Sequence, residues 1–252
     1  MITLGLGGAL RTLTRFPLPY RALEKEQRIL FWFPFIGALF GLFFVATSLL
    51  PFSPQIRSAL IIALSAYLSR GFHLDGLCDF ADGLGGGWDK ERSLAIMKDS
   101  HSGAFALITL FCVLLIQYAA LQQLADIPLA LMLVPVLGRL NQVIAASLMN
   151  YAREGEGTAS RLVRAAKPYH LVLPLLQILI VLVLLFIFSN EYALNAVSSF
   201  LATLLVCFFL MLVSKKRLGG VTGDVLGSVE VLTETAAMLG FLLPLASVAL
   251  PR

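Results

Sequence analysis

Three aspartates, Asp75, Asp79 and Asp82, are spaced so that they would share one face of a helix. Steps of four and three residues keep helical side chains within about 60° of one another. Clustered carboxylates repel, and burial worsens the repulsion, so they need a positive partner. Mg²⁺ suits this role because it binds a few carboxylate oxygens together with water and substrate phosphates. The three residues are therefore candidate catalytic and metal-binding groups for phosphoryl transfer, with a solvated helix end as the alternative.

A second acidic group lies near the end of the chain, at Asp224, Glu230 and Glu234. Glu230 and Glu234 are four residues apart, which places two like charges on one helical face. Like charges at the mouth of a membrane helix also require a cation. We expect Asp224 and Glu230 to join the metal site, while a helix cap is the alternative role for Asp224.

Candidate substrate-binding residues lie close to the three aspartates in the sequence. Gly85 and Gly86 belong to a glycine-rich stretch that can cradle a phosphate or simply end a helix. Lys98 can meet a phosphate. Asp99 is either a further metal ligand or a helix N-cap.

Two arginines complete the candidate substrate-binding set. Arg139 lies within an apolar stretch, where an arginine is costly unless it faces a cavity or a partner. Phosphate binding and a structural role both remain open for it. Arg153 follows the same stretch, and substrate contact explains it as well as ordinary cytoplasmic placement of positive charge does. His73 points away from the three aspartates on a helical wheel, so we predict a packed or interfacial histidine.

The composition indicates whether the segments that carry these residues lie in water or in lipid. Hydrophobic residues make up 58% of the 252 and charged residues 13%, with a mean hydropathy of +0.87. Soluble proteins carry about 25% charged residues, so lipid is the natural solvent for this chain. The net charge of +4 comes without a long basic stripe, which argues against nucleic-acid binding. The three cysteines lie far apart and match neither a zinc site nor a disulfide framework.

The sequence predicts an all-α fold, a polytopic transmembrane helical bundle of about seven spanning helices in a single integral membrane domain, 1–252. A spanning helix needs about 20 mostly apolar residues. The second predicted span is short and is expected to be tilted or extended at its end. Residues 1–28 are amphipathic in part and are expected to lie at the membrane interface. The predicted spans are 31–50, 56–72, 105–124, 129–149, 171–189, 194–213 and 231–250.

The positive residues predict the orientation of the chain, because Lys and Arg mark the cytoplasmic side. They gather before the first span, between the second and third, between the fourth and fifth, and after the sixth, while the alternate turns hold at most one. We therefore expect a cytoplasmic N-terminus. Segment 70–104 becomes a cytoplasmic active-site segment, and 214–230 a second cytoplasmic acidic segment.

Several motifs, in order along nearly the whole chain, resemble the cobalamin synthase family, the adenosylcobinamide-GDP ribazoletransferases. The two longest are HLDGLCDFADG at 73–83 and GGVTGDVLG at 219–227. Shorter ones are IMKDS at 96–100, YARE at 151–154, TRFP at 14–17 and FPFIG at 33–37. Cys78 stands where the family commonly has a small residue, and His101 where it often has arginine, which weakens a phosphate-binding role for position 101.

The resemblance implies a Mg²⁺-dependent enzyme in the inner cell membrane, with its active site facing the cytoplasm. Such enzymes join α-ribazole, or its 5′-phosphate, to adenosylcobinamide-GDP and release GMP. On that basis Asp75, Asp79 and Asp82 would hold metal on the pyrophosphate, a ribose hydroxyl would attack, and one aspartate could act as general base. The bilayer is the expected environment. A homo-oligomer, or association with other enzymes of cobalamin assembly, is compatible with this interpretation.

Other classes of membrane protein fit the sequence less well. CDP-alcohol phosphotransferases use a multi-aspartate motif for a similar displacement, but this chain lacks the long aspartate spacing of that motif, so the likeness is one of chemistry alone. A transporter would carry charges near the midplane, broken helices and inverted repeats, and only Arg139 fits that pattern. A scaffold would need no anionic cluster.

Overall fold

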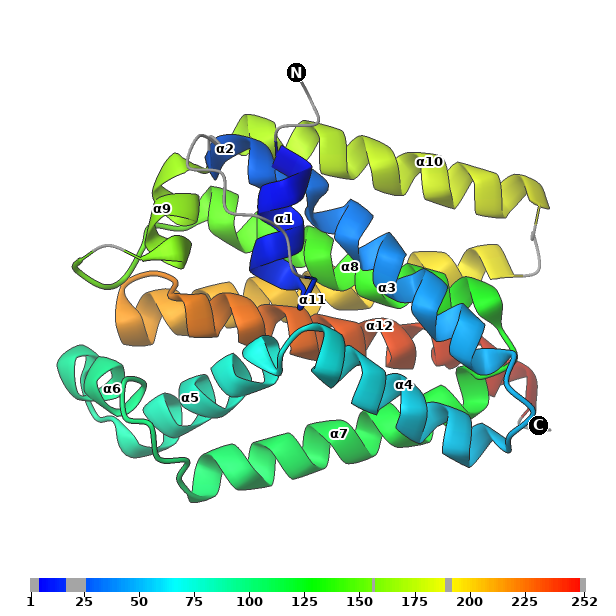
Figure 1. Cartoon of the computed structure of the whole chain (residues 1–252), viewed down its shortest axis with the longest axis horizontal. Helices are drawn as coiled ribbons and strands as arrows, with labels where there is room; N and C mark the ends of the chain where they lie inside the picture. The colour runs from blue at the N-terminus through cyan, green and yellow to red at the C-terminus, as the bar shows by residue number, and fades with distance from the viewer. Residues whose placement is uncertain (1–4, 17–25, 156, 189–191, 250–252) are drawn as a thin grey trace.

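The computed structural model describes residues 5–16, 26–155, 157–188 and 192–249, and these residues form a helical bundle (Figure 1). The predicted all-α membrane fold is confirmed. The helices of the described residues are α1 (Leu6–Leu13), α2 (Glu26–Ile29), η2 (Leu30–Trp32), α3 (Phe33–Ser48), α4 (Pro54–Leu68), α5 (Phe72–Gly86), α6 (Lys90–Ile96), α7 (Ala104–Leu124), α8 (Pro128–Leu148), α9 (Thr158–Ala165), η3 (Pro168–Leu171), α10 (Val172–Phe188), α11 (Ala193–Leu218) and α12 (Gly223–Ala249).

Five helices of the described chain are long and apolar enough to cross a membrane. The two other predicted spans correspond to α4 and α10, which have 15 and 17 residues and fall short of that length. The span predicted at 231–250 begins eight residues earlier, at Gly223, so much of the predicted segment 214–230 is helical. The five long spans are Leu30–Ser48, Ala104–Leu124, Pro128–Leu148, Ala193–Leu218 and Gly223–Pro244.

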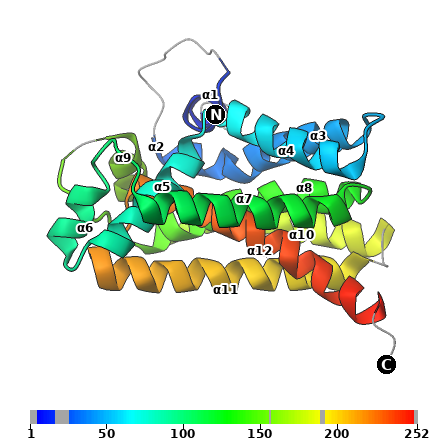
Figure 2. The same cartoon turned by 90° about the horizontal axis from the view of Figure 1, so that it is seen from below.

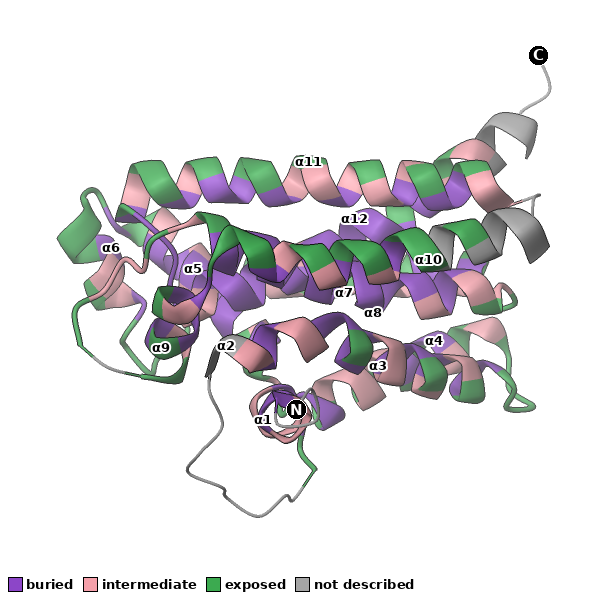
Figure 3. Ribbon diagram, turned by 90° about the horizontal axis from the view of Figure 1, so that it is seen from above, coloured by how far each residue is buried: buried purple, intermediate pink, exposed green. Residues whose placement is uncertain are grey.

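Helices α8 and α12 form the centre of the bundle. Within an apolar 18-residue window of each span, 89% and 83% of the residues are buried, against 28% for α7 and 33% for α11. Figure 3 shows the difference, with an exposed outer face along α11 and buried residues along α8 and α12. Because the outer helices expose apolar side chains such as Leu205 and Phe111, their outer faces suit lipid rather than water.

Small residues allow the helices to pack at close range. Gly37 and Gly41 are one turn apart on α3, and both face the backbone of α8. A Cβ added at Gly37 would lie 2.8 Å from the Cα of Val136, and one added at Gly41 would lie 2.9 Å from the Cα of Met132. Close backbone approach through paired glycines is a common way for membrane helices to associate.

The chain breaks between α4 and α5, and the N-terminal helix docks at that break. Arg70 and Gly71 both have a positive φ, 60° and 67°, which ends α4 and redirects the chain. The Arg70 guanidinium donates to the carbonyl of Arg11 at 3.0 Å, and Arg15 Nε donates to the carbonyl of Tyr67 at 3.0 Å. In Figure 1, α1 lies across the bundle, whereas α3 and α4 run along it. The predicted interfacial position of 1–28 stays a prediction, and residues 1–4 and 17–25 of it lie outside the described residues.

Candidate functional site

The three aspartates of α5 lie on one continuous helix, as the spacing predicts, but they differ in their surroundings. Asp75 is exposed, Asp79 is half-buried and Asp82 is buried. Helix α5 packs between α12 and α7, at the end of the bundle that also carries α6 (Figure 2). The acidic face of α5 is therefore partly enclosed by neighbouring helices.

A glycine lets α12 bring a fourth carboxylate to this face. Gly76 on α5 meets the backbone of Asp224, and a Cβ added at Gly76 would lie 2.9 Å from both the Cα and the carbonyl oxygen of Asp224. Ser228 on α12 donates to the carbonyl of Gly76 at 3.0 Å and fixes the same contact. Two acidic segments that are 149 residues apart in the sequence, at 75 and 224, thus meet across one helix contact.

The electrostatic consequence appears at Asp79. Burial, together with the neighbouring carboxylates of Asp224 and Asp75, raises the pKa of Asp79 to about 7. Arg153 opposes it, because its guanidinium lies 2.8 Å from a carboxylate oxygen of Asp224. Arg153 also donates to the carbonyl of Met97 at 3.3 Å, which ties the loop after α6 to the cluster. One arginine does not compensate the carboxylates around it.

Asp82 has a different role from its two neighbours on α5. Its carboxylate accepts hydrogen bonds from the backbone N–H of Gly103 at 2.5 Å and of Ala106 at 2.9 Å. These groups belong to the start of α7, whose first N–H groups have no partner within the helix. The negative charge of Asp82 is therefore stabilised by the N-terminus of α7. This contact fixes α7 and the preceding loop against α5.

The carboxylates fit Mg²⁺ by the type and number of oxygen donors, although not as a complete protein cage. Among the described residues, no group of three or more His, Cys, Asp and Glu side chains has the arrangement of a ready metal site. Mg²⁺ needs no such group, since it is usually held by one or two carboxylates, waters and substrate phosphates. Asp79 and Asp224, with Asp75 beside them, provide those carboxylates where positive charge is lacking.

The predicted substrate-binding residues of the α5–α7 region lie in different environments. A Cβ on Gly85 would collide with the ring of Phe105, and one on Gly86 would lie 3.2 Å from Ile96, so packing accounts for the absence of a side chain at Gly85. Lys98 is exposed. Asp99 is also exposed and accepts hydrogen bonds from the backbone N–H of His101 at 3.0 Å and from its ring at 2.7 Å, which lowers the pKa of Asp99.

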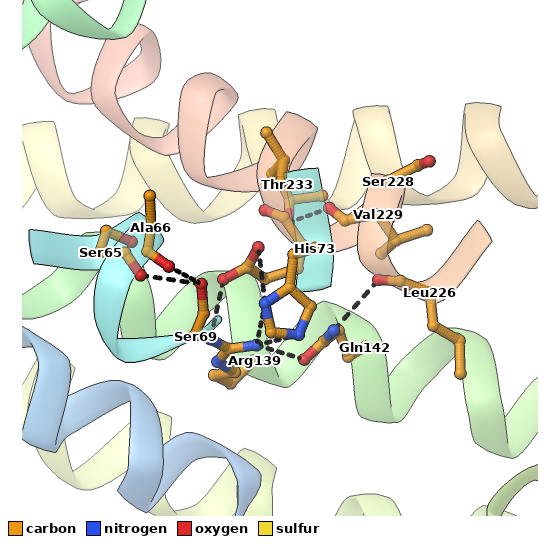
Figure 4. A network of polar contacts seen from close by, with 12 residues as sticks. Ser65, Ala66, Ser69, His73, Arg139, Gln142, Leu226, Ser228, Val229 and Thr233 are labelled. Carbon is orange, nitrogen blue, oxygen red and sulfur yellow. Dashed lines mark hydrogen bonds and ion pairs between the residues drawn. The ribbon is translucent and has the colours of Figure 1, made fainter. Parts of the chain in front are cut away.

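Arg139 lies within the packed bundle (Figure 4), and Glu230, also buried, is its ion-pair partner. The guanidinium of Arg139 lies 3.0 Å from a Glu230 oxygen, 2.9 Å from His73 Nε2 and 3.0 Å from Gln142 Oε1. Arg139 is 1% exposed, so its cation is enclosed by partners, and the structural role left open for it is the one the contacts support. Glu234 lies beside Glu230 in the same buried group. The prediction that His73 is a packed residue is confirmed.

Comparison with known proteins supports the family that the sequence motifs resemble. A model of the family described as Cobalamin-5-phosphate synthase matches residues 5–242. The chain belongs to this family. It is 39% identical over 244 residues to "Adenosylcobinamide-GDP ribazoletransferase" of Prosthecochloris aestuarii, covering 95% of this chain and 97% of that one. The protein of the same name from Chlorobium phaeovibrioides is 37% identical over 235 residues, with 91% and 93% covered. That of Acetivibrio thermocellus is 33% identical, with 92% and 94% covered. No solved structure matches this chain.

In this member of the cobalamin-5-phosphate synthase family, sequence reasoning missed one residue that shapes the site. Arg217, near the end of α11, donates to the carbonyls of Leu84 at 3.1 Å and Gly87 at 2.5 Å. A cation at these carbonyls stabilises the C-terminal end of α5 and holds the acidic helix in place. The signal available was the basic run 215–217, which by itself indicates only the cytoplasmic side of a span.

Proposed function

We propose that the chain is a multi-pass membrane transferase that joins α-ribazole, or its 5′-phosphate, to adenosylcobinamide-GDP and releases GMP with the help of Mg²⁺. Membership of the cobalamin-5-phosphate synthase family and the names of its relatives support the reaction. The observation that carries the choice of site is the meeting of Asp79 and Asp224 across Gly76, beside Arg153.

Four residues bind the diphosphate and its metal ion, or position the groups that do, in this proposal. Asp79 and Asp224 would hold Mg²⁺, and Asp82 holds α5 against α7 so that the two carboxylates keep their positions. When bound, Mg²⁺ would draw electron density from the phosphoryl oxygens and neutralise charge on the departing nucleotide. Arg153 adds a fixed positive charge beside Asp224 and can pair with a phosphate oxygen.

The displacement needs one proton acceptor. A ribose hydroxyl of the acceptor forms a new bond to the phosphorus that carries cobinamide, and the bond from that phosphorus to the oxygen of GMP breaks. The hydroxyl proton goes to a carboxylate. We assign this step to Asp75, because it is exposed and borders an open groove lined by Arg70, Phe72, Cys78 and Leu110 among others.

The same end of the bundle carries most of the positive residues, which supports a cytoplasmic active site. Helices α6 and α9 both lie at that end in Figure 1, and both contain Lys or Arg. The turns after α3 and α7 lie at the opposite end. Under the rule that Lys and Arg mark the cytoplasmic side, the acidic cluster faces the cytoplasm from the inner membrane.

Assay of the chain purified in detergent tests the proposal directly. We expect GMP release when adenosylcobinamide-GDP, α-ribazole or its 5′-phosphate, and Mg²⁺ are all present. EDTA should stop the release, and excess Mg²⁺ should restore it. Full turnover in EDTA would exclude the metal from the reaction, and no turnover with either acceptor would exclude the reaction itself.

A further inference from the structure

A polar pocket lies where α8 ends and the chain turns from α9 into η3. It has a volume of about 370 Å³. Helix α9 lies at the end of the bundle that carries the positive residues, so the pocket borders the membrane on that side (Figure 1). No carboxylate is among the described residues that line it. The lining residues are Ser147, Leu148, Met149, Asn150, Tyr151, Val163, Arg164, Ala166, Lys167 and Pro168.

The side chains of this pocket suit a phosphate group that has no positive group attached to it. Arg164 and Lys167 provide two cations, and Asn150 and Tyr151 add an amide and a hydroxyl that can donate hydrogen bonds. The hydroxyl of Ser147 lies in a side chain that is 9% exposed, and it has no hydrogen-bond partner. A buried hydroxyl without a partner is costly, so it favours a polar ligand in the pocket.

The pocket borders an apolar surface that suits acyl chains. Leu148, the last residue of α8, lines the pocket and is 47% exposed. On the other side, Pro168 begins η3, which leads directly into α10. The exposed face of α10 (Figure 3) runs over about 16 Å from residue 172 to residue 183, close to the hydrocarbon depth of one leaflet, which is half of about 30 Å. This face, the acyl stripe, includes Val172, Leu175, Leu176, Leu179 and Val183.

We propose that this pocket binds the headgroup phosphate of an anionic phospholipid, with the acyl chains along the acyl stripe of α10. Arg164 and Lys167 hold the phosphate, as cations at a membrane boundary commonly do. A lipid fits better than a water-soluble anion, because only a lipid fills the polar pocket and covers the adjoining apolar stripe together. The ammonium group of a zwitterionic headgroup meets two cations and no lining carboxylate among the described residues, so a headgroup with net negative charge is preferred.

Lipid titration of the full chain in a neutral detergent tests the assignment, because no charged bilayer surface is present there. Native mass spectrometry counts the bound lipids. We expect dioleoylphosphatidylglycerol to bind about tenfold more tightly than dioleoylphosphatidylethanolamine. Arg164→Gln and Lys167→Gln should each weaken phosphatidylglycerol binding about tenfold, since each removes a charge-assisted contact to the phosphate. Lys216→Gln is the matched control, because Lys216 is an exposed cation near the end of α11 that does not line the pocket, and its affinity should change less than about twofold.

Equal affinities of the wild-type chain for the two lipids would overturn the proposal. An equal loss of phosphatidylglycerol binding in Lys216→Gln and Lys167→Gln would also overturn it, because it would show only a general attraction between charges. Glycerol 3-phosphate separates a lipid from a free phosphate, since it carries the phosphate without acyl chains. It should not displace phosphatidylglycerol even at about a hundredfold excess. Displacement at equal concentrations would assign the pocket to a water-soluble phosphate ester instead. None of these measurements needs turnover, so they are independent of the proposed function.

Discussion

The substitution Arg139→Met separates a structural role of this arginine from the substrate-binding role predicted for it. Arg139 is 1% exposed and pairs with Glu230 at 3.0 Å, with His73 and Gln142 as further partners. Methionine preserves much of the volume but removes the charge. Glu230, which is 4% exposed, would then be left buried beside Glu234 without its cation.

The expected loss of stability is large. Removing one partner of a buried ion pair costs about 3–5 kcal/mol. For a chain of this size each kcal/mol lowers the melting temperature by about 2–4 °C, so we expect a decrease of roughly 6–20 °C. The assay is thermal unfolding in detergent, followed by KM for adenosylcobinamide-GDP at a temperature where both proteins are folded. KM should change little, because the side chain is enclosed by protein.

A double variant provides the control. Arg139→Met combined with Glu230→Gln removes both charges of the pair, so much of the lost stability should return. A normal melting temperature in Arg139→Met together with a large increase in KM would refute this reasoning. That result would place the Arg139 guanidinium on the substrate instead of on Glu230.

Three further predictions concern the acidic cluster. Gly76→Ala should separate α5 from α12 at Asp224, lower the free energy of unfolding by about 1–3 kcal/mol and lower kcat. An unchanged kcat would show that this helix contact does not position the catalytic carboxylates. Asp82→Asn removes one of the two carboxylate oxygens that accept hydrogen bonds from backbone N–H groups, so we expect the free energy of unfolding to fall by about 1–3 kcal/mol and hydrogen exchange at Gly103 to become faster. Lost activity at an unchanged melting temperature would instead make Asp82 a metal ligand. The pKa of Asp79 is raised from 3.8 to about 7, so its protonated form is the one that the metal-free fold favours. The stability that this carboxyl contributes is therefore present below about pH 4 and lost as pH rises through about 7. Mg²⁺ competes with the proton for the same carboxylate. The increase in melting temperature on adding Mg²⁺ should therefore be larger at pH 8 than at pH 6, and a pH-independent increase would contradict this.

The membrane fold was predictable because hydropathy and charge determine whether a segment lies in lipid or in water. Apolar stretches located the spanning helices to within a few residues at most boundaries. The alternation of cations predicts an orientation, which stays a prediction. The early start of α12 was not predicted, because Asp224 and Glu230 interrupt the apolar sequence before residue 231. Arg153 pairs with Asp224 and Arg139 pairs with Glu230, and such partners from distant segments are invisible in local composition.

The types of residue in the candidate site were predictable from the sequence, but the separate role of each residue was not. The spacing of Asp75, Asp79 and Asp82 gave their common helix. It could not reveal that Asp82 caps α7, because the partners at 103 and 106 become neighbours only through the fold. The association of Asp224 with Asp79 depends on Gly76, because a side chain there would collide with the backbone of α12. The sequence alone does not show that α12 lies against this glycine.

The most direct test of the central claim is the Mg²⁺ dependence of GMP release in Asp79→Asn and Asp224→Asn, with Glu91→Gln as an exposed control on α6. The account predicts that both aspartate variants fold and insert but lose nearly all activity, with any residual turnover needing far more Mg²⁺, while the control behaves as wild type. Wild-type turnover with an unchanged Mg²⁺ requirement in Asp79→Asn would contradict the claim that this carboxylate holds the metal for the displacement.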